Sequence, residues 1–240
     1  MIVVNTKSFA KGALLMLSFA AVFTTILMPV FPGSKGRVTG LDYADNLFNR
    51  LSKGSSWFIP EIAPRAAAMT GKEIEVAVPV ANAASAAAVV RLFTTNGAAA
   101  AETAGGMVRV KADFGKLLGA VLGDCEAIYH DRPESVRIKY GMDGYAALAR
   151  WWDALHPMIK EFQKMKRIPE AQLVDLVIRK GIEPAYNFRG IEAGSVKQEF
   201  AIMIALLVFY IFYTLWYGFA VFELFAGIGL TMKKGKKQEA

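Results

Sequence analysis

The sequence predicts a membrane-anchored α+β protein, in which two transmembrane helices, one N-terminal and one C-terminal, flank a small α/β sandwich domain outside the membrane. Three observations predict this fold. Each end of the 240-residue chain carries a long uncharged apolar run, charged residues make up only 20% of the chain, and the middle alternates between strand-like and helix-like patterns. Typical soluble domains carry about 25% charged residues, so an ordinary soluble enzyme is disfavoured. A hydrophobic content of 54% excludes a disordered chain.

The first apolar run, residues 12–34, contains no charged residue. As a helix it would extend for about 35 Å, enough to cross a hydrocarbon core of about 30 Å. The alternative is a cleaved signal peptide, with Lys7 and Lys11 as its basic region and a weak cleavage site at residues 18–20. Cleavage there would leave too short an apolar core, so we expect the run to stay as a transmembrane helix.

The second run, residues 200–222, is also uncharged, and after Glu223 it continues without charge to residue 232. At that length a core helix or a signal peptide is excluded, and a second transmembrane helix is predicted. The expected organisation of the chain is a cytoplasmic tail at 1–11, a transmembrane helix at 12–32, a connecting region with a short helix at 33–72, an extracytoplasmic α+β domain at 73–198, a transmembrane helix at 199–232 and a basic cytoplasmic tail at 233–240.

Basic residues gather beside both apolar runs. They are Lys7, Lys11, Lys233, Lys234, Lys236 and Lys237. Short loops rich in lysine and arginine stay on the cytoplasmic side of a membrane. We therefore expect a protein of the cytoplasmic (inner) membrane of a bacterium, with both termini cytoplasmic and the central domain periplasmic or extracellular.

Glu223 allows two registers for the second helix. It lies at the inner interface if the membrane core begins near residue 200, or near mid-membrane if the terminal lysines mark the inner edge. A carboxylate near mid-membrane needs a partner. The first run offers only small polar side chains, so a basic partner would come from another protein. Gly218 and Gly227 add a small face through which helices could associate.

The middle segment reads as alternating strands and helices. Strands are predicted at 73–80, 107–114 and 135–140, because their apolar residues alternate with polar ones. Alternation implies a sheet with one polar face, so we expect a three- or four-stranded sheet with helices mainly on one side. Pro79 indicates an edge strand. The alanine-rich stretch between residues 95 and 106 is expected to be a flexible loop. Helices are predicted at 43–51, 82–95, 114–129, 143–167 and 169–180.

No catalytic, cofactor or metal site is predicted. The two histidines are His130 and His156, and Cys125 is the only cysteine. His130 lies close to Cys125, Glu126 and Asp131, but side chains near a helix end more often cap the helix than bind a metal, and no group orients a nucleophile.

Trp151 and Trp152 are adjacent, so only one of them can face the core. The other, together with Arg150, is a candidate protein interface, although a tryptophan filling a groove beneath a loop is an equal alternative. The sequence shows no nucleic-acid-binding motif or basic stripe with aromatic platforms. The expected partners are membrane lipid and either another membrane protein or further copies of this chain.

These features favour an accessory or anchoring subunit whose outer domain docks on a partner in a larger membrane complex of transporter or respiratory type. The short tails exclude a self-contained receptor. One alternative is a ligand-sensing module that signals through a separate membrane partner. Another is an oligomer similar to polysaccharide chain-length regulators, which resemble this chain in topology only. Their long coiled-coil helices and the proline-rich approach to the second span are missing here. The remaining hypothesis is an enzyme that acts on the outer side of the membrane.

Overall fold

The computed structural model describes residues 3–230, and the chain divides into two compact units. The terminal unit consists of residues 1–51 and 194–240, and the central unit consists of residues 52–193. Of the membrane-flanking lysines, four lie outside the described residues: Lys233, Lys234, Lys236 and Lys237.

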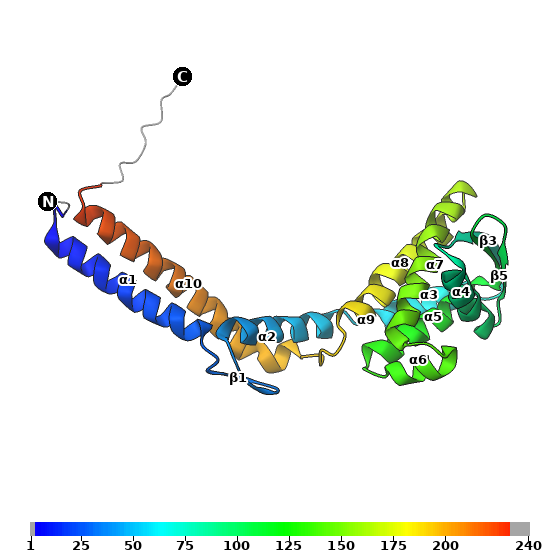
Figure 1. Cartoon of the computed structure of the whole chain (residues 1–240), viewed down its shortest axis with the longest axis horizontal. Coiled ribbons are helices and arrows are strands. Elements are labelled where there is room, and N and C mark those ends of the chain that lie inside the picture. Colours follow the sequence, from blue (N-terminus) through cyan, green and yellow to red (C-terminus); the bar gives the residue numbers. More distant parts are fainter. Residues whose placement is uncertain (1–2, 231–240) are drawn as a thin grey trace, which may run out of the picture. The chain divides into compact units, whose positions relative to one another are not determined.

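Two long helices, α1 (Thr6–Leu27) and α10 (Val196–Gly227), lie side by side in the terminal unit (Figure 1). Both helices are long and apolar enough to cross a membrane, by length and composition. With a rise of 1.5 Å per residue they extend for about 33 and 48 Å. The Asn5 side chain caps α1 by accepting a hydrogen bond from the Ser8 amide at 3.1 Å.

Glycines allow the two helices to touch along their backbones. A Cβ at Gly12 would lie 2.6 Å from the Leu224 amide nitrogen, and a Cβ at Gly227 would lie 2.7 Å from the Phe9 Cα atom. No side chain larger than hydrogen fits at either position unless the helices separate. These pairings show that α1 and α10 run antiparallel, with the beginning of one beside the end of the other.

A short hairpin follows α1. Its strands β1 (Phe31–Gly33) and β2 (Gly36–Val38) are antiparallel. Helix α2 (Gly40–Ser55) comes next and is longer than the helix expected at 43–51.

Within the terminal unit, α2 is tied to the beginning of α10. The Arg50 carbonyl accepts a hydrogen bond from the Gly194 amide at 2.8 Å. The Arg50 guanidinium also pairs with the Glu199 carboxylate at 2.8 Å. The chain positions on either side of the central unit are therefore neighbours.

The central unit is a mixed helical and small-sheet structure with one hydrophobic core. Its elements, in chain order, are α3 (Ile59–Ala67), β3 (Glu73–Pro79), α4 (Ala83–Thr95), β4 (Ala99–Thr103), β5 (Met107–Asp113), α5 (Phe114–Tyr129), α6 (Pro133–Tyr140), α7 (Gly144–Lys164), α8 (Ile168–Val177), the π-helix η1 (Ile178–Ile182) and α9 (Glu183–Asn187). The strands form one antiparallel sheet in the order β3-β5-β4.

The sheet has one buried and one polar face, as the alternation predicts. Val76 of β3 and Val110 of β5 are paired and buried under helices such as α4 and α7. On the opposite face, Glu73 pairs with Lys111 at 3.4 Å, and both charged side chains are exposed. Strand β3 lies at an edge, as Pro79 indicated.

The prediction of a strand at 135–140 is wrong, because this segment forms helix α6. Pro133 begins the helix and Gly141, at a φ of 64°, ends it in the left-handed conformation. Buried Val136 and Tyr140 are four residues apart, a spacing that suits a helix as well as a strand. Ile138, which the alternating pattern placed in the core, is 73% exposed.

The third strand is β4, in the alanine-rich stretch that we expected to be a flexible loop. It forms a hairpin with β5, in which Ala100 is opposite Val110. Gly105 and Gly106 make the turn with φ values of 83° and 70°. Thr103 is paired with Met107, so the hairpin loop has three residues, 104–106. Its two residues with positive φ are glycines, which adopt this conformation without strain.

Helix α3 belongs to the central core. Ile59, Ile62 and Ala66 are buried in it, and Trp57 packs on the Tyr129 ring at a centroid distance of 4.7 Å. The compact unit therefore begins near residue 52, within the region that we expected to be a connection up to residue 72.

Candidate functional site

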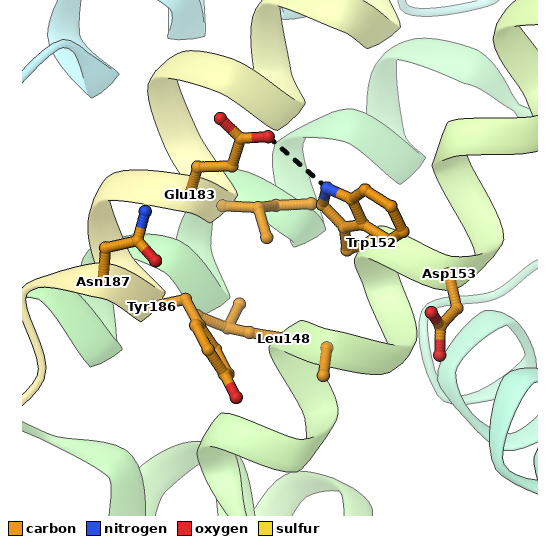
Figure 2. Close-up of a pocket in the computed structure, with 8 residues that line it drawn as sticks. Leu148, Trp152, Asp153, Glu183, Tyr186 and Asn187 are labelled. Carbon is orange, nitrogen blue, oxygen red and sulfur yellow. Dashed lines mark hydrogen bonds between the residues drawn. The ribbon is translucent and has the colours of Figure 1, made fainter.

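A groove opens on the surface of the central unit between α7 and the segment formed by η1 and α9 (Figure 2). Its cavity volume is about 380 Å³. The groove is lined by Leu148, Ala149, Trp152 and Asp153 from α7, and by Ile182, Glu183, Tyr186 and Asn187 from η1 and α9.

A wide helical turn shapes one wall of the groove. Pro184 has no amide hydrogen, so it cannot donate to the Lys180 carbonyl as an α-helix requires. The helix widens there into the π-turn η1, in which the Glu183 amide donates to the Ile178 carbonyl five residues earlier. Beyond the turn, Glu183 and Tyr186 are three residues apart and share the face of α9 that lines the groove.

The two adjacent tryptophans separate as predicted. Trp151 is fully buried, and its indole nitrogen donates a hydrogen bond to Asp124 at 2.9 Å. Trp152 is 38% exposed and lines the groove. It stacks on His156 with ring centroids 4.7 Å apart, and its indole nitrogen donates to Glu183 at 3.4 Å.

Arg150 lies beside the groove but does not line it. Its guanidinium pairs with the Asp153 carboxylate at 2.7 Å, which neutralises one of the two acidic groups of the groove. The other acidic group, Glu183, makes no ion pair with any lysine, arginine or histidine among residues 3–230. The nearest basic residues along the chain are engaged elsewhere, since Arg179 pairs with Asp175 and Lys180 pairs with Glu61 at 3.7 Å. The groove therefore carries an uncompensated negative charge beside exposed aromatic rings.

Behind α7, a buried carboxylate is held by a polar network. Asp124 is 3% exposed and accepts hydrogen bonds from Trp151, from the Tyr140 hydroxyl and, at 2.8 Å, from the Lys139 ammonium. Burial and the neighbouring Asp124 charge raise the pKa of the Tyr140 hydroxyl, so it remains a proton donor. Because every member has a partner, this network fixes the packing of α5, α6 and α7 and leaves no group free for a ligand.

Cys125, His130 and Asp131, which are close in the sequence, have separate surroundings in the structure. Cys125 is fully buried, and burial together with the Asp124 charge raises the pKa of its thiol. His130 packs against the Trp57 ring, and Asp131 pairs with the Lys53 ammonium at 3.0 Å. Within the described part of the chain, no three histidine, cysteine, aspartate or glutamate side chains are placed to hold a metal ion.

In the terminal unit, Glu223 finds a basic partner within the chain. Its carboxylate lies 2.6 Å from the Lys11 ammonium. We expected a basic partner from another protein if Glu223 lay near mid-membrane, whereas here Lys11, at the edge of the first apolar run, reaches across to α10. The exposed Lys7 lies one turn earlier on α1.

The two glycines singled out in α10 have different surroundings. Gly227 lies against Phe9 of α1, whereas a Cβ at Gly218 would meet no atom within 4 Å. Of these two glycines, Gly227 contributes to the contact between α1 and α10, whereas Gly218 presents an open face.

Comparisons with known proteins find no family model, no curated protein and no solved structure that matches this chain.

The sequence indicated the α7 side of the groove through Trp152, but it did not indicate the α9 side. Glu183, Tyr186 and Asn187 lie about 30 residues later in the chain, and no spacing pattern connects them to Trp152. Pro184, inside a helical pattern, is the one local signal of an irregular helix at this position.

Proposed function

We propose that this chain is an integral membrane accessory or anchoring subunit whose extracytoplasmic domain docks on a partner in a larger membrane complex, of transporter or respiratory type. One observation carries the proposal: Trp152 and Tyr186, which are 38% and 47% exposed, lie on the rim of one groove around an unpaired carboxylate. Tryptophan, tyrosine and arginine dominate the binding energy of protein interfaces, so exposed aromatic residues around a groove favour a docking surface.

The proposed topology places both termini in the cytoplasm and the central unit in the periplasm or outside the cell. Lys7 and Lys11 precede an apolar helix, and the positive-inside rule places such residues on the cytoplasmic side. The antiparallel pairing of α1 and α10 supports two crossings. The ion pair between Lys11 and Glu223 supports an interfacial level for Glu223, at the cytoplasmic end of both apolar segments.

The surface of the helical pair supports a membrane location as well. Leu14 and Leu17 of α1 are 69% and 70% exposed, and Phe219 of α10 is 61% exposed. Large apolar side chains in such numbers are stable in lipid and not in water. The open face at Gly218 offers a position where a helix of the partner can approach closely.

Photo-crosslinking in the membranes of the native host tests the proposal. A benzoylphenylalanine at Tyr186 should give one discrete crosslinked product, because this side chain lies at the docking surface. The same probe at Ile138, which is 73% exposed on α6, is the matched control and should give none. A chain that purifies from mild detergent as a clean monomer, with no crosslink at either position, would overturn the proposal.

A ligand-sensing module is the second candidate, and the cavity volume favours it. A volume of about 380 Å³ falls within the range of about 300–1,000 Å³ that small-molecule sites occupy. On this reading a small molecule should raise the thermal stability of the full chain by binding its folded state. If no small molecule in a screen does so and the probe at Tyr186 gives a crosslink, the docking function is favoured over ligand sensing.

A further inference from the structure

We propose that the groove receives an arginine side chain of the partner protein, whose guanidinium group stacks on the Trp152 ring and pairs with the neighbouring Glu183 carboxylate. This inference rests on the proposed docking function and names the chemistry of the contact. Figure 2 shows Trp152, Glu183, Tyr186 and Asn187 around one open space, with Leu148 on another side of it.

The charge of the groove selects a cation. Asp153 is already paired with Arg150, but Glu183 has only the weak hydrogen bond from Trp152, at 3.4 Å. A cation that lies over the indole face and beside this carboxylate gains both an ion pair and attraction to the aromatic ring. Such a cation would be partly desolvated by the groove walls, which strengthens both interactions.

The shape of the groove selects a planar cation on an apolar stem. Leu148 and Ile182 are almost fully buried and supply apolar contact for methylene groups. The guanidinium group of arginine is flat, so it can stack on the Trp152 ring while two of its N–H groups point at Glu183 and the Asn187 carbonyl. The ammonium of lysine lacks a flat face and binds such a site less well.

The openness of the groove favours a side chain carried by a protein over a free compound. Sites for small molecules bury about 70–90% of the ligand surface. Here the two aromatic walls, Trp152 and Tyr186, are themselves 38% and 47% exposed, so a free compound would remain largely in water. A protein surface that brings the arginine would cover these walls and exclude the water.

A ligand titration of the full chain in nanodiscs of neutral lipid tests the inference, with empty nanodiscs as the blank. The probe is butylguanidinium, which reproduces the arginine side chain, and its binding is followed by saturation-transfer NMR. We expect saturable binding at millimolar concentration, about tenfold weaker binding of butylammonium, and none of the neutral butylurea. Absence of saturable butylguanidinium binding, or equal binding of all three probes, would overturn the inference.

Two variants locate the binding. Glu183→Gln should weaken butylguanidinium binding by about tenfold, and Trp152→Leu should weaken it by about fivefold. The matched control is Glu102→Gln, which removes a carboxylate from exposed strand β4, outside the groove. Unchanged binding in both groove variants assigns the probe to another surface and contradicts the inference.

A last comparison distinguishes an arginine carried by a protein from a small free cation. N-acetylarginine methylamide carries the backbone that a partner would carry, so it should bind at least as well as butylguanidinium. If the added backbone abolishes binding, the occupant is a small free cation and the partner part of the inference fails. The docking function is tested separately by the crosslink at Tyr186, which can persist when butylguanidinium does not bind.

Discussion

The buried ammonium of Lys53 lies 3.0 Å from the carboxylate of Asp131, and it also donates a hydrogen bond to the Ile191 carbonyl. The Lys53 side chain is only 2% exposed, whereas that of Asp131 is 43% exposed. The Tyr129 hydroxyl donates to the Lys53 carbonyl, so the residue is fixed at both its backbone and its side chain. This one lysine joins the beginning and the end of the central unit.

Removing the charge of Asp131 should therefore destabilise the central unit. Asp131→Asn leaves the Lys53 cation buried without its counter-ion, and we expect the free energy of unfolding to fall by about 2 kcal/mol. Asparagine tolerates the positive φ of 55° at this position, so the effect reports the charge and not the backbone. Pulse proteolysis of the full chain in urea measures it. Asp153→Asn, in the exposed pair with Arg150, should change the value by less than about 0.5 kcal/mol. Equal effects of the two substitutions would show that burial of Lys53 is unimportant.

The central unit should lose stability in acid partly through Glu170. Burial raises the pKa of this carboxyl, but ion pairs with Lys72 and Arg167 outweigh burial and lower the pKa to about 2. Because the folded-state pKa lies below the unfolded value, the contribution is present above pH 4.5 and is lost as the pH falls towards 2. The full contribution is about 3 kcal/mol by linkage.

Unfolding of the Glu170→Gln variant measures this contribution. Its free energy of unfolding should be lower than that of the wild type at pH 7, and it should fall less steeply between pH 4.5 and 2. The control Glu102→Gln, on exposed β4, should keep the wild-type pH dependence. Parallel pH curves for wild type and Glu170→Gln would contradict the ion-pair account.

Two glycines of the terminal unit should respond differently to the same substitution. Gly12→Leu forces a side chain into the backbone of α10 and should destabilise the helical pair by about 1–3 kcal/mol. Gly218→Leu meets open space and should leave the pair intact. Thermal unfolding of the detergent-solubilised chain, followed by circular dichroism, compares them. A loss of stability in Gly218→Leu equal to that in Gly12→Leu would mean that the helices pack through another face.

Cysteine labelling tests the proposed topology. The native Cys125 is fully buried and its raised thiol pKa keeps it protonated, so the wild-type chain should not react with a membrane-impermeant maleimide. In intact cells, or spheroplasts if an outer membrane is present, Glu102→Cys should be labelled. Lys7→Cys should be labelled only after the inner membrane is permeabilised. The reverse pattern would invert the orientation.

Features that depend on local pattern were predictable from the sequence. The two apolar helices follow from uncharged length alone, and the polar face of the sheet follows from the alternation around Val76 and Val110. The start of α5 also has a local signal, since Asp113 directly precedes the helix and its carboxylate accepts a hydrogen bond from the Lys116 amide at 3.0 Å.

Features that depend on tertiary contact were not predictable. The segment of α6 has apolar residues at 136, 138 and 140, which alternate as in a strand, but only Val136 and Tyr140 are buried. From the helix, the Tyr140 hydroxyl reaches Asp124 of α5, a contact that no local pattern signals. Alanine is uncommon in strands, so the sequence of β4 gives little indication of one. Pairing with β5 makes this segment a strand in spite of its low strand propensity. The groove and the pair between Lys11 and Glu223 join residues that are distant in the chain, so no local spacing signals them.

The hydrogen bond between Arg50 and Gly194 indicates where the central unit could be deleted or replaced. Because these residues touch at 2.8 Å, a turn of a few residues can replace everything between them, and the paired helices would still close upon themselves. The same junction would accept an unrelated folded insert whose ends lie close together. The central unit could therefore be exchanged for another domain without breaking the contact between α1 and α10.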